Sequence, residues 1–375
     1  MSRCAIFGAF CAFTTLASAG PPQYTFIEIG PSPLTLWEVH DLGSQGQAIG
    51  RAWANTNPPQ RRGFIWQNGT ITQLEGPAGE TITEARCIDN NGVIYGGFAD
   101  RRFNLNLARM HPVRWVSGTP TPYSNNLSIN TSTIFNCAPT SGAAVGWAAP
   151  YVPAAPGWNG EFGYASELPF GDADPVRAFI WSGDSGRVLT QELGMSDDSA
   201  EDINDSGQAA INLNGFEVGG AARFDPRTGV VRLPTLGASL PNAGWASFVF
   251  AINESGQIVG RSQTAGGVEH PVRWDGAALV DLGLLPGFIE GEARDINDAG
   301  AVVGTLSNQN FGFGVAPTAG FIVLNGSMHN LNTLVSGPAP FAIAAGRSIN
   351  NAGQILVEDA GGFGSRRYGI LTPSR

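Results

Sequence analysis

The chain has 375 residues and a formal net charge of −10, with 31 acidic residues against 21 basic ones, all of them arginine. A chain this acidic is a poor binder of nucleic acid. The absence of lysine excludes both the lysine of a phosphate-binding loop and a Schiff-base lysine.

Residues 1–19 predict an export signal. Arg3 supplies the positive charge, the run from Cys4 to Leu16 is short and apolar, and Ala17-Ser18-Ala19 fits a small-residue cleavage site. The apolar run is shorter than the roughly 20 residues that cross a bilayer, and no later segment comes close. We therefore expect a mature chain of residues 20–375 that is secreted or periplasmic and has no membrane span.

A hexapeptide recurs along the mature chain. It reads DINDSG at 202–207 and DINDAG at 295–300, and related or degenerate copies occur elsewhere. The seven copies end at Gly46, Gly92, Gly142, Gly207, Gly256, Gly300 and Gly353. Their mean spacing of about 51 residues is typical of propellers and solenoids. We therefore expect residues 20–375 to form one domain.

The Asp and Asn residues of these hexapeptides resemble the ligands of a calcium loop. Such a loop needs a bidentate glutamate six residues after its glycine, and leucine stands there after Gly207 and Gly300, as Leu213 and Leu306. We assign the hexapeptides to turn formation instead, because Asn and Asp accept turn geometry and glycine supplies positive φ.

Each repeat predicts four short antiparallel strands. In the fifth repeat, two apolar segments flank the turn within 251–260, the sequence PVRW follows at 271–274, and LVDLG follows at 279–283. The turn residues between the first two segments favour a β-hairpin. Four strands per repeat and seven repeats predict an all-β, seven-bladed β-propeller with four-stranded antiparallel blades.

In this seven-bladed arrangement the last repeat lacks a fourth strand, and the N-terminal segment supplies an extra one. The last repeat stops after its third strand, at RRYGILTPSR, whereas YTFIEIG at 24–30 is a spare strand before the first repeat. We predict that the N-terminal strand, at about 23–30, closes the last blade and so removes an open sheet edge.

Two recurring patterns carry a resemblance to a known family. The first is Ile-Asn-Asp-Ser-Gly followed by an apolar run that ends in glycine, and the second is an aromatic-Ile-Trp segment with a triplet before the tryptophan. The triplets here are Arg62-Gly63-Phe64, His111-Pro112-Val113, Arg177-Ala178-Phe179 and His270-Pro271-Val272. The chain resembles the HAF-repeat family of bacterial extracellular proteins over nearly all of its mature length. The resemblance implies an exported bacterial repeat protein and carries no catalytic residues with it.

A long insertion at 147–176 interrupts the third repeat. It contains the aromatic residues Trp147, Tyr151, Trp158, Phe162 and Tyr164 and the carboxylates Glu161, Glu167, Asp172 and Asp174. Flat aromatic rings beside carboxylates suit a carbohydrate, and paired carboxylates can hydrolyse glycosides. The alternative is a Pro- and Gly-rich loop that packs its aromatic residues onto the rim.

Three arginines stand two residues before the isoleucine of a predicted inner strand: Arg86, Arg294 and Arg347. If their side chains converge at the mouth of a central channel, they can bind a carboxylate or phosphate. The alternative is that they form salt bridges with Glu84, Glu201 and Glu292.

Cys87 and Cys137 occupy equivalent positions in adjacent repeats, so they form either one disulfide or two buried thiols. His111 and His270 lie in separate repeats, too far apart to share an ion. Since no other Cys or His spacing matches a metal motif, we expect neither a metal site nor a cofactor.

These patterns favour a non-catalytic binding module that is exported, monomeric and directed at a glycan or an extracellular protein. The alternative is a polysaccharide hydrolase or lyase that uses carboxylates of the 147–176 insertion. Propellers support both kinds of function, so the fold alone does not choose between them.

Overall fold

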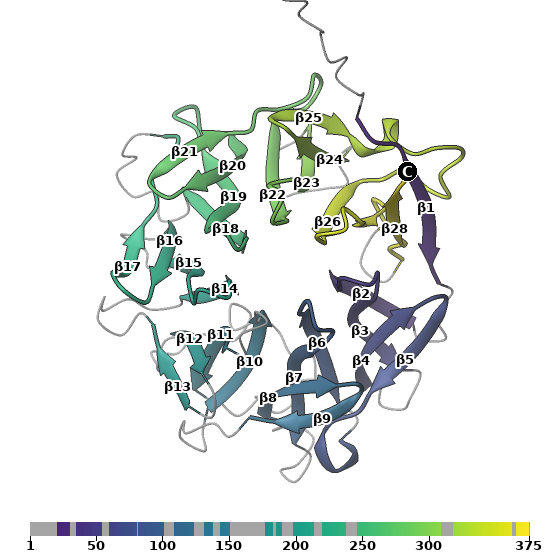
Figure 1. Cartoon of the computed structure of the whole chain (residues 1–375), viewed down its shortest axis with the longest axis vertical. Coiled ribbons are helices and arrows are strands. Elements are labelled where there is room, and N and C mark those ends of the chain that lie inside the picture. The colour runs from purple at the N-terminus through teal and green to yellow at the C-terminus, as the bar shows by residue number, and fades with distance from the viewer. Residues whose placement is uncertain are drawn as a thin grey trace, which may run out of the picture.

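The computed structural model describes residues 21–30, 35–54, 60–80, 82–100, 109–123, 131–137, 143–150, 177–182, 185–189, 198–213, 220–237, 246–308, 318–361 and 365–374. Within these residues, 28 strands form seven four-stranded antiparallel sheets. The sheets are arranged around a central axis, with one strand of each innermost (Figure 1). The all-β propeller with four-stranded antiparallel blades that the sequence predicted is confirmed.

We number the blades from the first complete sheet. Blade 1 contains β2 (Thr35–Leu42), β3 (Ala48–Ala54), β4 (Gln60–Gln67) and β5 (Thr70–Leu74). Blade 2 contains β6 (Thr83–Ile88), β7 (Ile94–Asp100), β8 (Arg109–Val116) and β9 (Thr119–Pro122). Blade 3 contains β10 (Thr131–Cys137), β11 (Ala143–Pro150), β12 (Arg177–Ser182) and β13 (Ser185–Val188). Blade 4 contains β14 (Ser199–Ile203), β15 (Ala209–Leu213), β16 (Gly220–Asp225) and β17 (Gly229–Arg232).

Blade 5 contains β18 (Ser247–Ile252), β19 (Gln257–Gln263), β20 (Glu269–Asp275) and β21 (Ala278–Asp281). Blade 6 contains β22 (Glu290–Ile296), β23 (Val302–Ser307), β24 (Thr318–Leu324) and β25 (Ser327–Asn330). The remaining sheet, blade 7, has the order β26 (Ala345–Ile349), β27 (Ile355–Glu358), β28 (Tyr368–Pro373) and β1 (Tyr24–Ile29). The N-terminal strand β1 is therefore the outer strand of this sheet, in register with β28 from Tyr24↔Pro373 to Ile29↔Tyr368.

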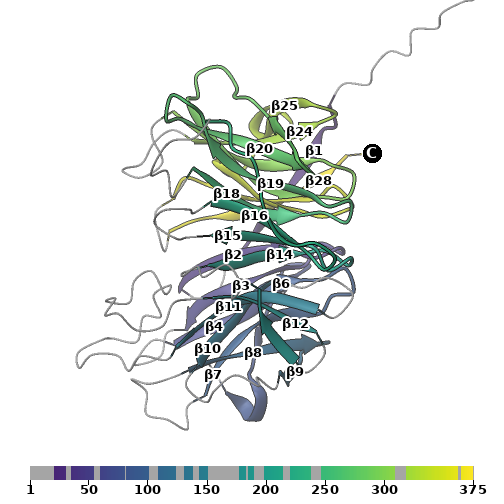
Figure 2. The same cartoon turned by 90° about the vertical axis from the view of Figure 1, so that its left-hand side faces the viewer.

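Apolar side chains pack between neighbouring blades. One core cluster joins Leu233 of blade 4 to Val249 and Trp274 of blade 5, and the side view shows the sheets stacked face to face (Figure 2). The Trp274 indole N–H donates to the Pro234 carbonyl at 2.8 Å, at the end of the outer strand of the preceding blade. Trp115 makes the same contact with the Glu75 carbonyl at 2.6 Å. Trp115 and Trp274 thus join neighbouring blades through packing and a hydrogen bond, whereas the buried indole N–H of Trp66 makes no such bond with a described residue.

Each inner strand carries a β-bulge near its end, at the residue before its last two positions in six blades and at the residue before its last position in blade 3. The register of all seven inner pairs shifts at this point. The bulged residues are His40, Arg86, Asn136, Glu201, Phe250, Arg294 and Arg347. A bulge re-aims a side chain and increases the local twist of its strand.

The bulge explains why several blades have a glycine, such as Gly50 or Gly260, on the strand next to the inner strand. A Cβ atom at Gly50 would lie 2.0 Å from the Glu38 carbonyl oxygen, and one at Gly260 would lie 1.8 Å from the Phe248 carbonyl oxygen. The inner strand thus approaches its partner so closely that only glycine fits opposite it.

The hexapeptides join the blades to one another. The Asn253 amide donates to the Asn297 carbonyl of the next blade at 3.1 Å, while its oxygen accepts the Gln257 N–H of its own turn at 2.9 Å. The same pair of contacts recurs at Asn204, Asn297 and Asn350, the last of which donates to the Gly43 carbonyl at 2.9 Å. One asparagine per turn therefore closes its own hairpin and links it to the next blade.

We predict that Asn253→Ala lowers the free energy of unfolding by about 1–3 kcal/mol, because it leaves the buried Asn297 carbonyl and the Gln257 N–H without partners. The midpoint of urea unfolding measures this change. Asn90→Ala is the matched control, since Asn90 is an exposed asparagine of an equivalent turn. Equal shifts in the two variants would show that the amide does not link the blades.

Candidate binding site at the central axis

A polar pocket lies where the inner strands end and their turns begin. It has a volume of about 150 Å³ and is lined by residues from six blades. Its wall includes Asp41, Asp202, Asp295 and Ser348, which directly precede the last residue of their inner strands. We call it the turn-side pocket. Its rim adds the carboxylates Asp89, Glu254 and Asp298.

The three wall carboxylates hold neighbouring blades together. Asp202 accepts the N–H of Ile203 in its own strand and that of Ile252 in the next blade, both at 2.8 Å. Asp295 makes the same pair of bonds, with the Ile349 N–H of the next blade at 2.7 Å. Asp41 accepts the Ile88 N–H at 3.0 Å and the Ser348 hydroxyl at 2.8 Å.

Burial changes the acidity of these carboxyl groups. It raises the pKa of Asp202 to about 8 and that of Asp295 to about 7, and it also raises the pKa of Asp41. The negative charges add to the effect, because Asp295 and Asp41 raise the pKa of Asp202, and Asp41 raises that of Asp295. The backbone N–H donors oppose it. Two carboxyl groups that titrate near neutral pH, those of Asp202 and Asp295, therefore line the turn-side pocket.

Basic residues occupy the bulges of four successive blades. They are Arg294 of blade 6, Arg347 of blade 7, His40 of blade 1 and Arg86 of blade 2, and we call them the basic band. Each arginine forms an ion pair: Arg86 with Glu84, Arg294 with Glu292, and Arg347 with Glu358 at 2.9 Å. Arg294 also lies over the Phe250 ring, 4.5 Å from its centroid.

In these ion pairs the carboxylate is the more buried partner. The Glu292 side chain is 4% exposed against 32% for Arg294, and Glu358 is 11% exposed against 24% for Arg347. Arg366, the second cation beside Glu358, is about one third exposed. A molecule that reaches this part of the inner strands therefore meets guanidinium groups before it meets their carboxylates.

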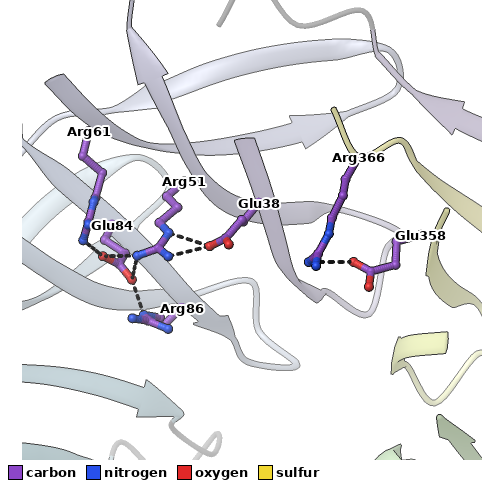
Figure 3. A network of polar contacts seen from close by, with 7 residues as sticks. All are labelled: Glu38, Arg51, Arg61, Glu84, Arg86, Glu358 and Arg366. Atoms are coloured by element: carbon purple, nitrogen blue, oxygen red, sulfur yellow. Dashed lines mark hydrogen bonds and ion pairs between the residues drawn. The ribbon is translucent and has the colours of Figure 1, made fainter. Parts of the chain in front are cut away.

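Glu84 is the centre of the largest network (Figure 3). Its side chain is 1% exposed and pairs with Arg61 at 2.7 Å, with Arg51 at 3.3 Å and with Arg86. Arg51 in turn pairs with Glu38 at 2.6 Å. Burial by itself would raise the pKa of Glu84, but the three guanidinium groups hold it far below its usual range. Glu84 is therefore an ionised structural anchor for three arginines.

The sequence left two roles open for Arg86, Arg294 and Arg347, anion binding and salt bridges, and the structure tests the salt bridges. Their salt bridges with Glu84 and Glu292 are confirmed, but the expected pairing of Glu201 is wrong: Arg347 pairs with Glu358, while Glu201 binds Ser199 and Asn212. Because each guanidinium group keeps its own carboxylate, the three arginines do not meet as one bare cluster.

The other site residues predicted from the sequence remain predictions. Tyr151, Trp158, Glu161, Tyr164, Asp172 and Asp174 lie outside the described residues, as does the side chain of Trp147. Cys87 is disulfide-bonded. The side chain of Cys137 lies outside the described residues, so the pairing of these two cysteines stays a prediction.

Asp202 and Asp295 are the first residues of two hexapeptides, which we assigned from the sequence to turn formation and not to a pocket. The sequence did not single out Asp41, His40 or Glu358. A signal exists for the three aspartates, since each directly precedes the Ile or Leu at the end of an inner strand. In the described part of the chain, no group of three or more His, Cys, Asp or Glu residues is placed to hold a metal ion. No helix among the described residues is long and apolar enough to span a membrane.

We predict that Glu84→Gln lowers the free energy of unfolding by about 3 kcal/mol or more, because it removes the buried carboxylate charge that three largely buried guanidinium groups share. Chemical denaturation measures this change. Glu28→Gln is the matched control: it removes an exposed pair with Arg367 and should cost less than about 1 kcal/mol. Similar losses in both variants would contradict the structural role of Glu84.

We predict that stability falls as the pH rises from about 6.5 to about 8.5. The folded-state pKa values of Asp202 and Asp295, about 8 and about 7, lie above the ordinary value of 3.8, so the folded state binds more protons and loses this advantage as the pH passes those values. Burial lowers the pKa of His40 from 6.5, so the unfolded chain binds the extra proton; this opposes the trend at the lower end of the window and fades as the pH rises further above 6.5.

Urea unfolding midpoints at several pH values test this dependence. Asp202→Asn should reduce the slope with pH, whereas Asp298→Asn, at an exposed carboxylate of the same pocket, should keep it. A midpoint that is constant or rises over this range would show that the buried carboxyl groups are ionised throughout.

The comparisons with known proteins show the fold. No family model and no curated protein match the sequence. An oligogalacturonate lyase of Vibrio parahaemolyticus matches with a TM-score of 0.53 at 9% identity, over 93% of this chain and 97% of that one. An acylaminoacyl peptidase of Pyrococcus horikoshii matches with a TM-score of 0.50 at 10% identity, over 86% of this chain and about half, 49%, of that one. The chain is thus similar in fold to propeller proteins of different activities.

Proposed function

We propose that the protein is an exported, non-catalytic binding module that acts as a monomer and holds a glycan at the central axis of the ring. The observation that carries this proposal is that, in the ion pairs of the inner-strand arginines, the arginine is more exposed than its carboxylate partner. Arg294 and Arg347 are half-buried, with about a third and a quarter of the side chain exposed, whereas Glu292 and Glu358 are buried. A guanidinium group offers several N–H donors in one fixed plane, which suits the oxygen atoms of a sugar.

The framework beneath these arginines favours binding without rearrangement. Ion pairs fix the guanidinium groups, and the Asn and Asp hydrogen bonds between blades fix the strands that carry them. A site that is already ordered loses little conformational entropy when its ligand arrives. Export, and the resemblance to bacterial HAF repeats, enter the proposal from the sequence alone.

The described carboxylates near the axis support a binding role over catalysis. Asp202 and Asp295 each accept two backbone N–H groups, and Glu84 is held by three arginines. These groups already serve as links between strands. The hydrolase or lyase alternative depends on the carboxylates of 147–176, and no contact among the described residues favours it.

A glycan array with the mature protein tests the proposal. We expect binding that weakens at least about tenfold in Arg294→Gln, because the exposed guanidinium group is lost. Arg367→Gln is the matched control, since Arg367 is an exposed arginine that pairs with Glu28 on β1, the outer strand of blade 7. A third variant replaces residues 147–176 with a short Gly/Ser linker and reports whether the insertion contributes.

Circular dichroism should confirm that all variants are folded. If the mature protein binds no glycan, or if Arg294→Gln binds as the wild type does, the axial glycan site is wrong. Binding that is lost only in the linker variant would move the site to the insertion and make each of its carboxylates a candidate for turnover assays.

A further inference from the structure

We propose that the basic band binds an oxyanion, the carboxylate or sulfate group of an acidic glycan, and that His40 gains a proton when this group binds. The proposal rests on the glycan-binding role above and names the chemical class of its ligand. The same site would take a free anion of the same chemistry, which gives an independent test.

The members of the basic band lie on neighbouring inner strands. Asn297 of blade 6 donates to the carbonyl of Asn350 in blade 7, and Asn350 donates to that of Gly43 in blade 1. The Ile88 N–H of blade 2 donates to Asp41 of blade 1. Blades 6, 7, 1 and 2 are therefore joined in sequence at the turns directly below the four bulges. The band is a continuous arc.

At one point of this arc the arginines outnumber the carboxylates with which they pair. Glu358 pairs with both Arg347 and Arg366. Two guanidinium groups thus share one largely buried carboxylate, in a chain whose net charge is −10. A local surplus of cations in an acidic protein attracts an anion.

The exposure of the side chains places this surplus within reach of a ligand. Arg294, Arg347 and Arg366 are each about a quarter to a third exposed. Arg347 binds Glu358 through its Nε atom, and Arg294 binds Glu292 through one terminal nitrogen. An oxyanion accepts two N–H groups from one guanidinium in a planar, bidentate contact. These arginines can therefore bind an anion while they keep their ion pairs.

His40 couples this site to pH. Its Nε2 atom is buried and makes no hydrogen bond to any residue that the structure describes. Burial lowers the pKa of His40 well below 6.5, and the nearby cations Arg86, Arg51 and Arg347 lower it further, whereas Glu84 raises it. The imidazole is therefore neutral at pH 7 in the unliganded protein. An anion in the band would oppose the effect of the arginines and favour the imidazolium form.

The sign of the coupling follows from linkage. If the bound anion raises the pKa of His40, binding takes up a proton and affinity increases as the pH falls. A return of this pKa to its ordinary value near 6.5 would strengthen binding about tenfold between about pH 7.5 and about pH 5.5. The arginines stay charged throughout this range. The pKa values of Asp202 and Asp295, about 8 and about 7, lie in or near this range, and that of Asp41 is raised, so a His40 variant is needed to separate their contribution.

Isothermal titration of the mature protein with sodium sulfate, at constant ionic strength in chloride, tests the proposal. Sulfate does not change its charge between these pH values. We expect saturable binding that strengthens about tenfold at the lower pH and, at about pH 6.5, proton uptake that is visible as a dependence of the heat on the buffer. His40→Asn should keep the binding and lose most of its pH dependence. Arg294→Gln should weaken the binding, and the control Arg367→Gln should leave it unchanged.

Three results would overturn the proposal: no saturable sulfate binding at either pH, binding without proton uptake in the wild type, or an unchanged pH dependence in a folded His40→Asn variant. The proton uptake is measured on the wild type and so holds even if His40→Asn does not fold. Glycan binding without any sulfate binding would sink this inference and leave the proposed function intact. Sulfate binding with proton uptake in a protein that binds no glycan would do the reverse.

Discussion

The hydrogen bonds that cross from one blade to the next at the central axis are the interaction on which this structure depends. Apolar packing holds neighbouring sheets together, but it is not directional and tolerates sliding. The amide of Asn253 and the carboxyl group of Asp202 each bind a backbone group of the following blade. Such bonds require one register, because a buried donor or acceptor that misses its partner is costly. The recurrence of the hexapeptide therefore reflects a demand of the whole ring.

The bulges extend this arrangement from stability to the candidate site. A regular strand would continue the alternation of side chains that packs one face against the next blade. The extra residue at each bulge interrupts that alternation, so that residues such as Arg86 and Arg294 can be polar beside an apolar interface. The requirement for glycine at positions such as Gly260 follows from the same distortion. In each inner strand, therefore, the bulged residue can be polar while its neighbours pack against the next blade.

The sequence predicted the fold well because its signals are local. The spacing of the hexapeptides, the turn residues and the recurring tryptophans each act within one repeat or between equivalent places in neighbouring repeats. The second role of Asn253 was missed because turn chemistry already accounts for an asparagine at that position, and the carbonyl it contacts is 44 residues away. Glu358 was missed for a related reason: the equivalent second-strand position in blades 1 and 5 is an arginine, Arg51 or Arg261, so no repeat pattern marks it.

The order of polar groups along the inner strands makes the ring electrically polar. The carboxyl groups of Asp41, Asp202 and Asp295 line the turn-side pocket, and the residues just before them in the sequence are His40, Glu201 and Arg294. The guanidinium groups of Arg294 and Arg347 lie on this second level, away from the turns. Burial leaves Asp202 and Asp295 partly protonated near pH 7, so the negative end comes mainly from the rim carboxylates Asp89, Glu254 and Asp298. The field of charges separated in this way reaches about 8 Å at physiological ionic strength, so an anion is repelled at the turns and attracted at the level of the guanidinium groups.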